Sequence, residues 1–328
     1  MVFCQGGLVK RALVVVAVTG LCLMGTAPAW AVFPGANGRI TYSAYGGIIH
    51  TILPSGHGDT VIAPQTSTDP AWSPTGRRLT FTGDPEGFGG QPDIYTMRAD
   101  GSDVRRLTFE SEDTASGGAW HPSYSPGGGR IAFSLWHYRS EQIATIRNDG
   151  SHRRVIASWG EAGRAPIGVV WSPSGEVAYV LGIGGSPTGR PSIFAMRSDG
   201  THKHHLVDLG RGGGFGPVYS PDGGEFLFSR VWRDGSVHTR LAERGRKQHP
   251  KAAVRAHPRP DALALFVLPD GAWVLARNVN QDTGAASLVR VSLRSCRGKR
   301  VVGHFGGSAD WQALPDMPPT RVTGSEHR

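Results

Sequence analysis

Cysteine is scarce in this 328-residue chain, which contains only Cys4, Cys22 and Cys296. Two of the three lie within the first 31 residues, so a protein processed after that point has no internal disulfide and must be stabilised by packing alone. The sequence also lacks a Gly-x-Ser-x-Gly nucleophile elbow, a His-Glu-x-x-His pair and paired cysteines. It therefore carries no motif of a serine hydrolase or of a zinc site.

Long hydrophobic runs are missing as well. Lys10 and Arg11 precede a mainly apolar run of twelve residues, Ala12 to Leu23, and Ala29-Trp30-Ala31 has the small-x-small pattern of a secretory cleavage site. Twelve helical residues span about 18 Å, whereas a bilayer core is about 30 Å thick. We expect a signal peptide over residues 1–31 and an exported protein without a membrane span, in the periplasm, at the cell wall or outside the cell.

The composition is rich in turn formers and in positive charge. There are 47 glycines and 23 prolines, which suit many short strands better than helices. Residues 1–31 carry two basic and no acidic side chains, so their removal lowers the formal net charge from +9 to +7. This charge favours an anionic surface or polymer as a partner and does not specifically indicate a nucleic acid.

A short motif recurs through most of the chain. An aromatic residue followed by Ser-Pro-x-Gly begins at Trp72, Tyr124, Trp171 and Tyr219, and a decayed copy begins at Val267. The four aromatic residues are separated by 52, 47 and 48 residues. A fixed period of about 50 residues is the signature of a repeat architecture. We expect the repeated aromatic side chains to fill space between neighbouring units; stacking on a ligand is the alternative.

The second half of each unit repeats too. The segments at 94–102, 143–151 and 193–201 each alternate apolar residues and end in Asp-Gly-Ser or Asp-Gly-Thr. Asp-Gly supplies the positive-φ turn of a tight hairpin, and period-two alternation is typical of strands. Each unit is therefore predicted to be a four-stranded antiparallel meander.

The two ends of the chain complement each other. Residues 38–43 resemble a second strand without a first, and Ala309-Asp310-Trp311 resembles a first strand without a second. Pairing them makes a sixth unit and leaves no exposed sheet edge. We predict an all-β fold over residues 32–315, a closed six-bladed β-propeller, and a disordered tail over 316–328. The predicted blades are 69–108, 119–157, 167–208, 215–255, 260–303 and the composite of 38–63 with 308–315.

These motifs, together with the closing segment Asp310 to Pro315, resemble the TolB-like six-bladed propellers of bacterial exported proteins over about residues 37–315. The resemblance implies the fold and says little about function. TolB carries an α/β domain before its propeller, which we do not expect here, so the resemblance does not imply TolB's role in a cell-envelope complex. Serine peptidases of the prolyl-oligopeptidase type use similar blades but add a hydrolase domain.

Three aspartates are candidate metal ligands. Asp69, Asp261 and Asp310 fall at or just before the first strands of three consecutive blades, so they could converge on the mouth of the central channel and hold Ca²⁺. The alternative is that each carboxylate accepts hydrogen bonds from backbone amides at the start of its strand. We expect no other cofactor.

Loop length points to one face of the ring. The connections between first and second and between third and fourth strands are short, whereas those on the opposite face are long and irregular. Variable loops confined to one face mark the binding face of a repeat protein, and exposed aromatic and arginine side chains anchor recognition. The candidate binding residues in this long-loop face are Trp136, Tyr138, Arg139, Trp159, Arg190, Arg211 and Trp232. Alternatively, the aromatic residues among them cover the ends of the blades.

The sequence thus favours a monomeric, non-enzymatic exported binding scaffold that engages a protein or an anionic cell-envelope polymer through the long-loop face. A basic stretch from Arg240 to Arg259 could contact polyanions or could simply be a solvated edge. The alternative function is a propeller-type lyase or hydrolase with a metal at the channel mouth. The sequence does not identify the partner.

Overall fold

The computed structural model describes residues 36–63, 66–84, 91–112, 116–137, 140–160, 166–182, 190–211, 213–220, 222–231, 237–243, 262–267, 273–279, 286–292, 298–303, 305 and 308–314. The predicted signal peptide and C-terminal tail lie outside these residues. In the described part of the chain no helix is long and apolar enough to cross a membrane.

Apart from one short 3₁₀ helix, η1 (Glu110–Glu112), the described regular elements are strands in antiparallel sheets. Sheet 1 contains β23 (Ala309–Leu314), β1 (Ala36–Ala44), β2 (Ile48–Ile52) and β3 (Thr60–Ala63). Sheet 2 contains β4 (Ser67–Trp72), β5 (Arg78–Gly83), β6 (Asp93–Arg98) and β7 (Arg105–Arg106). Sheet 3 contains β8 (Ser116–Tyr124), β9 (Arg130–His137), β10 (Ser140–Arg147) and β11 (Arg154–Gly160).

The remaining sheets follow the same order. Sheet 4 contains β12 (Ile167–Trp171), β13 (Glu176–Leu181), β14 (Ser192–Arg197) and β15 (His204–Asp208). Sheet 5 contains β16 (Gly214–Tyr219), β17 (Glu225–Val231) and β18 (Val237–Glu243). Sheet 6 contains β19 (Ala262–Val267), β20 (Trp273–Val279), β21 (Ala286–Ser292) and β22 (Gly298–Val302). The fourth strand expected for sheet 5 falls at 244–255, outside the described residues.

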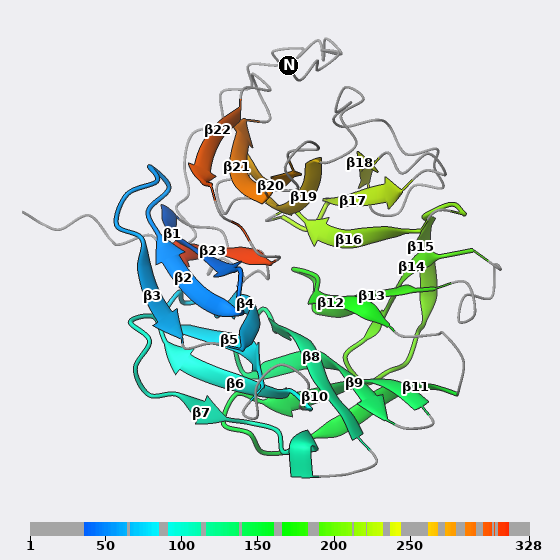
Figure 1. The fold of residues 1–328 in the computed structure, drawn as a ribbon. Helices are drawn as coiled ribbons and strands as arrows, with labels where there is room; N and C mark the ends of the chain where they lie inside the picture. The colour runs from blue at the N-terminus through cyan, green and yellow to red at the C-terminus, as the bar shows by residue number, and fades with distance from the viewer. Residues whose placement is uncertain are drawn as a thin grey trace, which may run out of the picture.

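The sheets follow one another around a centre, and the first strand of each lies innermost (Figure 1). Each innermost strand contacts the innermost strand of the next sheet, from β23 through β4, β8, β12 and β16 to β19, which contacts β23 again. The protein is therefore an all-β propeller with four-stranded antiparallel blades, as the repeat predicted.

The ring is closed by the two ends of the fold. Strand β23 pairs antiparallel with β1, with Ile40 opposite Trp311 and Thr41 opposite Asp310. The Ser43 amide also donates to the Ser308 carbonyl at 2.8 Å. The predicted pairing of the C-terminal strand with the N-terminal sheet is confirmed.

The recurring Ser-Pro-x-Gly segment forms the turn between first and second strands. The amides of Ser73 and Gly76 bond the carbonyls of Arg78 and Ser73, and the Ser73 hydroxyl accepts from the Arg78 amide. Gly76 has φ +63, a conformation that glycine adopts without strain. The same amide-to-carbonyl pattern recurs around Ser125, Ser172 and Ser220, so the repeat encodes turn chemistry.

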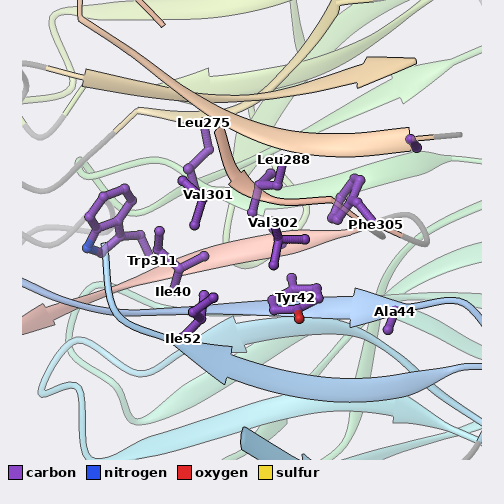
Figure 2. Packing of buried hydrophobic residues seen from close by; sticks show 12 residues of the cluster. Ile40, Tyr42, Ala44, Ile52, Leu275, Leu288, Val301, Val302, Phe305 and Trp311 are labelled. Carbon is purple, nitrogen blue, oxygen red and sulfur yellow. The ribbon is translucent and has the colours of Figure 1, made fainter. Parts of the chain in front are cut away.

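The aromatic residues of the repeat are buried between neighbouring sheets. Trp72, Tyr124, Trp171 and Tyr219 are each at most 3% exposed. Trp72, for example, lies in a cluster with Ile49 of sheet 1 and Leu79 of sheet 2. Figure 2 shows the equivalent contact between sheets 6 and 1, where Leu275 and Leu288 face Ile40 and Trp311. The expectation that these side chains fill space between blades is confirmed.

Candidate functional site

Asp310 bridges sheets 1 and 2 at their innermost strands. One carboxylate oxygen accepts from the Trp72 amide of β4 at 2.6 Å, and the other accepts from the Trp311 amide of β23 at 2.7 Å. Burial raises the pKa of Asp310 to about 7, although both amides favour the charged form. These contacts are those of the alternative to a metal site, in which each carboxylate accepts hydrogen bonds from backbone amides.

The same position bridges sheets 3 and 4. Ser123 directly precedes Tyr124 of the repeat, as Asp310 directly precedes Trp311, and its hydroxyl accepts from the Trp171 amide of the next sheet at 3.2 Å. At these two positions a polar residue before the aromatic residue of the repeat joins one blade to the next. The polar residue before the aromatic residue is visible in the sequence. Its role could not be predicted, because it depends on which backbone amide of the next blade lies beside it.

Asp69 has a different environment from Asp310. Its own amide donates to the Ser308 hydroxyl at 2.9 Å, and its carboxylate accepts from the hydroxyls of Thr68 at 3.3 Å and Thr82 at 3.4 Å. These contacts place Asp69 beside β23, on the sheet next to Asp310. Within the described residues its carboxylate contacts these two hydroxyls, whereas the Asp310 carboxylate accepts from two amides.

The backbone gives a reason for an aspartate at position 69. Asp69 has φ +51 in a register shift of β4, and His121, Gly168 and Gly216 have φ +52, +62 and +108 at the equivalent shifts of β8, β12 and β16. A bulge in this conformation favours glycine and, among other residues, Asp, Asn and His. Asp69 therefore meets a conformational requirement that recurs around the ring.

The three aspartates cannot all be placed together. Asp261 lies outside the described residues, and the residues that the structure does describe contain no group of three or more His, Cys, Asp or Glu side chains arranged to hold a metal ion. The predicted calcium site therefore stays a prediction that depends on Asp261.

Of the predicted binding residues, Trp136 is an exposed aromatic side chain on the long-loop face. It lies near the end of β9, is 43% exposed, and its ring centroid is 6.2 Å from that of Trp120. Trp159 was expected in a loop but lies within β11, where it packs on the core between sheets 3 and 4 with its ring 5.3 Å from Tyr179. Trp159 therefore contributes to packing.

The other predicted binding residues divide into two groups. Arg190 and Arg211 are exposed, before β14 and after β15 respectively. Tyr138, Arg139 and Trp232 lie outside the described residues.

Two further aromatic residues are exposed on this face and were not among the binding residues predicted from the sequence. Tyr45, in the turn between β1 and β2, is 57% exposed, and Phe109, between β7 and β8, is 55% exposed. The Arg106 guanidinium lies 4.5 Å from the centroid of the Phe109 ring. Phe109 belonged to a loop that the sequence assigned to the binding face, and Tyr45 follows residues 38–43, which the sequence already predicted to be a second strand.

The kind of exposed apolar side chain differs between the surfaces. Within the described residues, the large exposed aromatic side chains are Tyr45, Phe109 and Trp136, all on the long-loop face. The large exposed aliphatic side chains lie on outer strands or at short turns, and they are Leu53, Val61, Val104 and Val155. The long-loop face of sheets 1–3 is thus the aromatic one.

Comparison with known proteins supports the fold. No protein-family model matches the sequence, and no curated protein does. TolB from Acinetobacter baumannii superposes with a TM-score of 0.67 at 14% identity, over 84% of this chain and 67% of that one. A chain of a nidogen–laminin complex gives 0.65 at 13% identity, over 84% of this chain and 99% of that one. A gluconolactonase from Xanthomonas campestris gives 0.54 at 16% identity, over 87% and 91%.

These identities establish a shared architecture and nothing about activity, because one propeller fold serves many unrelated functions. The chain is a β-propeller that is structurally similar to the propeller of TolB.

Proposed function

We propose that this protein is an exported, non-enzymatic binding scaffold that engages a protein or an anionic cell-envelope polymer through its long-loop face. In this proposal it is a TolB-like propeller, monomeric, in which each of the six sheets is a complete four-stranded blade. Export follows from the predicted signal peptide over residues 1–31, which lies outside the described residues.

One observation carries the proposal: the confinement of Tyr45, Phe109 and Trp136 to one face. Aromatic side chains bury a large area with few rotatable bonds, and they are enriched among the residues that dominate interface energies. Exposure of all three in one part of the described surface is therefore more informative than scattered exposed aliphatic residues, which are normal on any protein.

The scaffold beneath these side chains favours binding. Arg106, which lies over the Phe109 ring, is itself fixed by Asp93, whose carboxylate is fully buried and lies 2.7 Å from the guanidinium. Trp136 is supported by Trp120. Side chains held in this way lose little conformational entropy when a partner binds, so more of the contact energy contributes to affinity.

A pull-down from the producing organism's envelope fraction tests the proposal. A variant with Tyr45, Phe109 and Trp136 changed to alanine should recover the partner at least tenfold less efficiently than the unaltered protein. The matched control changes three exposed aliphatic residues, Leu53, Val61 and Val104, to alanine, and should recover it as well as the unaltered protein does.

Both variants are compared only after circular dichroism and melting show that they are folded. Equal recovery by the aromatic variant and its control would show that this face does not bind the partner.

The alternative is a propeller-type lyase or hydrolase with a metal at the channel mouth. The observation in its favour is that Asp69 and Asp310 lie on adjacent innermost strands. Calcium titration of the melting temperature, compared between the protein and its Asp69→Asn variant, distinguishes this alternative from a metal-free scaffold.

A further inference from the structure

Three arginines converge on one aspartate at the short-turn end of sheet 2. Arg78 begins β5, Arg98 ends β6 and Arg105 begins β7. The Asp103 carboxylate lies 2.8 Å from Arg78 Nη1 and 2.8 Å from Arg105 Nε. Arg98 Nε lies 3.7 Å from the same carboxylate. Sheet 2 therefore contains an anion site that is filled by a side chain of its own.

The strand register brings these arginines together. Arg78 is opposite Arg98 across β5 and β6, and Thr96 of β6 is opposite Arg105 of β7. Alternate residues of a strand share a face, as do residues opposite each other on antiparallel strands. All three arginines therefore lie on one face of sheet 2, and Arg78 Nε also donates to the Thr96 hydroxyl at 3.3 Å.

Sheet 3 has the same set of arginines at the same positions. Arg130 begins β9, Arg147 ends β10 and Arg154 begins β11. Arg130 is opposite Arg147, and Thr145 of β10 is opposite Arg154. Arg130 Nη1 lies 3.5 Å from the Thr145 hydroxyl, the counterpart of the arginine–threonine contact in sheet 2. The three arginines of sheet 3 therefore also share one face at the short-turn end.

Sheet 3 lacks the aspartate. His152 stands where sheet 2 has Asp103, and the two residues have φ +55 and +52, so the backbone is alike. Within the described residues, no carboxylate lies within ion-pair distance of Arg130, Arg147 or Arg154. The group that sheet 2 supplies from its own chain is thus missing from an otherwise equivalent arrangement.

The turn aspartates do not make up this difference. Asp149 accepts from the Ser151 amide at 2.8 Å in sheet 3, and Asp100 accepts from the Ser102 amide at 2.9 Å in sheet 2. Hydrogen bonds from the turn, and then the charge of a nearby arginine, lower the pKa of both aspartates. Because both sheets have this turn aspartate, it cannot replace the Asp103 carboxylate in sheet 3.

We propose that Arg130, Arg147 and Arg154 bind an aspartate side chain of an acidic peptide at the short-turn end of sheet 3. In sheet 2 the aspartate offers its carboxylate and also its backbone carbonyl, which accepts from Arg78 Nη2 at 3.1 Å. A peptide offers both acceptors, whereas a free anion offers only the first. Guanidinium groups form strong charge-assisted hydrogen bonds with carboxylates.

The site is accessible and independent of the proposed binding face. Arg147 and Arg154 are exposed, and Arg130 is half-buried. All three lie at the ends of strands that the short turns connect, on the side of the ring opposite the long loops. The inference therefore adds a second surface to the proposed scaffold.

The test is an NMR titration of the nitrogen-15-labelled protein, at constant ionic strength, with the capped peptide acetyl-Gly-Asp-Gly-amide. This peptide should shift the Nε–H signals of the three arginines. It should bind at least tenfold more tightly than the matched peptide that has Asn in place of Asp.

Two variants with equal loss of charge locate the binding. Arg147→Gln with Arg154→Gln removes two exposed charges from sheet 3 and should weaken binding at least tenfold. The matched control, Arg197→Gln with Lys203→Gln, removes two exposed charges from the short-turn end of sheet 4 and should bind within twofold of the unaltered protein.

A third variant, His152→Asp, supplies the missing carboxylate. It should occupy the site from within and weaken peptide binding at least tenfold. The pKa of the introduced carboxyl group, measured by NMR, should fall well below the ordinary value of 3.8, because Arg78 and Arg105 hold the pKa of Asp103 at about 2 in the equivalent position.

Equal binding of the two peptides, equal weakening in the sheet 3 and sheet 4 variants, or an ordinary pKa in His152→Asp would overturn the proposal. Inorganic phosphate that binds as tightly as the acidic peptide would overturn the assignment to a peptide. The aromatic variant of the pull-down keeps all three arginines, so failure of this site is distinguishable from failure of the proposed binding face.

Discussion

Sheets 1 and 2 differ from sheets 4 and 5 in how their polar groups are paired. In sheet 2, Arg78 lies 2.8 Å from Asp103, and Arg106 lies 2.7 Å from the fully buried Asp93. The guanidinium groups of Arg78 and Arg105 hold the pKa of Asp103 at about 2. Each of these partly buried charges has an opposite charge fixed beside it.

Where sheets 1 and 2 meet, polar side chains are also paired, but their partners are neutral backbone groups. The Gln312 side-chain nitrogen donates to the Gly76 carbonyl at 2.6 Å, and its oxygen accepts from the Arg39 amide at 2.9 Å. Asp310 also accepts from two amides, although these do not fully offset its burial, which raises its pKa. Between sheets 4 and 5, by contrast, the acceptor that Arg230 contacts within the described residues is the Asp208 carbonyl, and burial together with the charges of Arg240 and Arg190 lowers the pKa of Arg230.

The two regions show two consequences of burying a polar side chain. A matched polar group recovers its desolvation energy inside the protein, so it acts in stability. A positive group without a fixed opposite charge instead costs stability when it is partly buried. The following changes test that division, from the largest expected effect to the smallest.

Deleting residues 308–315 removes β23 and with it the contacts of Ser308, Asp310 and Gln312. The edge of β1 and the cluster around Ile40 and Tyr42 would be left uncovered, so we expect cooperative loss of the fold or aggregation. Circular dichroism and analytical size exclusion measure the outcome. A truncated protein that melts like the full-length one would show that closure by β23 does not stabilise the ring.

The second change tests Asp310 through pH. Its pKa in the folded protein, about 7, lies above the ordinary value of 3.8, so the folded state holds this proton more tightly than the unfolded chain does. Its contribution to stability is therefore complete below about pH 4 and is lost as the pH rises through 7. The free energy of unfolding should fall over this range by on the order of 4 kcal/mol more than in Asp310→Asn.

Urea unfolding at pH 4, 5.5, 7 and 8 measures this difference. Parallel pH profiles for the two proteins would show that burial of Asp310 does not raise its pKa.

The third change compares one arginine from each region. Arg106→Gln leaves the Asp93 carboxylate buried without its cation and should lower the free energy of unfolding by about 3 kcal/mol. Arg230→Gln loses bonds to a carbonyl but relieves repulsion by Arg240 and Arg190, so it should change stability by less than about 1 kcal/mol.

Chemical unfolding followed by tryptophan fluorescence measures both variants under one condition. An Arg230→Gln variant that loses as much stability as Arg106→Gln would place Arg230 among the structural residues and remove the distinction between the two regions.

The sequence alone determined the propeller. Each repeat unit makes its turn and its packing contacts within itself and with the neighbouring unit, as Ser73, Gly76 and the buried Trp72 do. The residues that make these contacts therefore recur in the sequence with a period of about 50 residues. The same pattern predicted closure by β23, because the incomplete units at the two ends of the chain make one complete sheet when they pair.

Only the tertiary structure decided which aromatic residues are exposed and which polar residues contact one another across sheets. Trp159 looked like a loop residue and is packed against Tyr179, whereas Tyr45 looked unremarkable in sequence and is exposed. Arg190, Arg230 and Arg240 come from three separate segments, and no local pattern connects them. The Arg230 guanidinium reaches the Asp208 carbonyl only because strands of two adjacent sheets meet there, and a contact of that kind depends on packing rather than on sequence spacing.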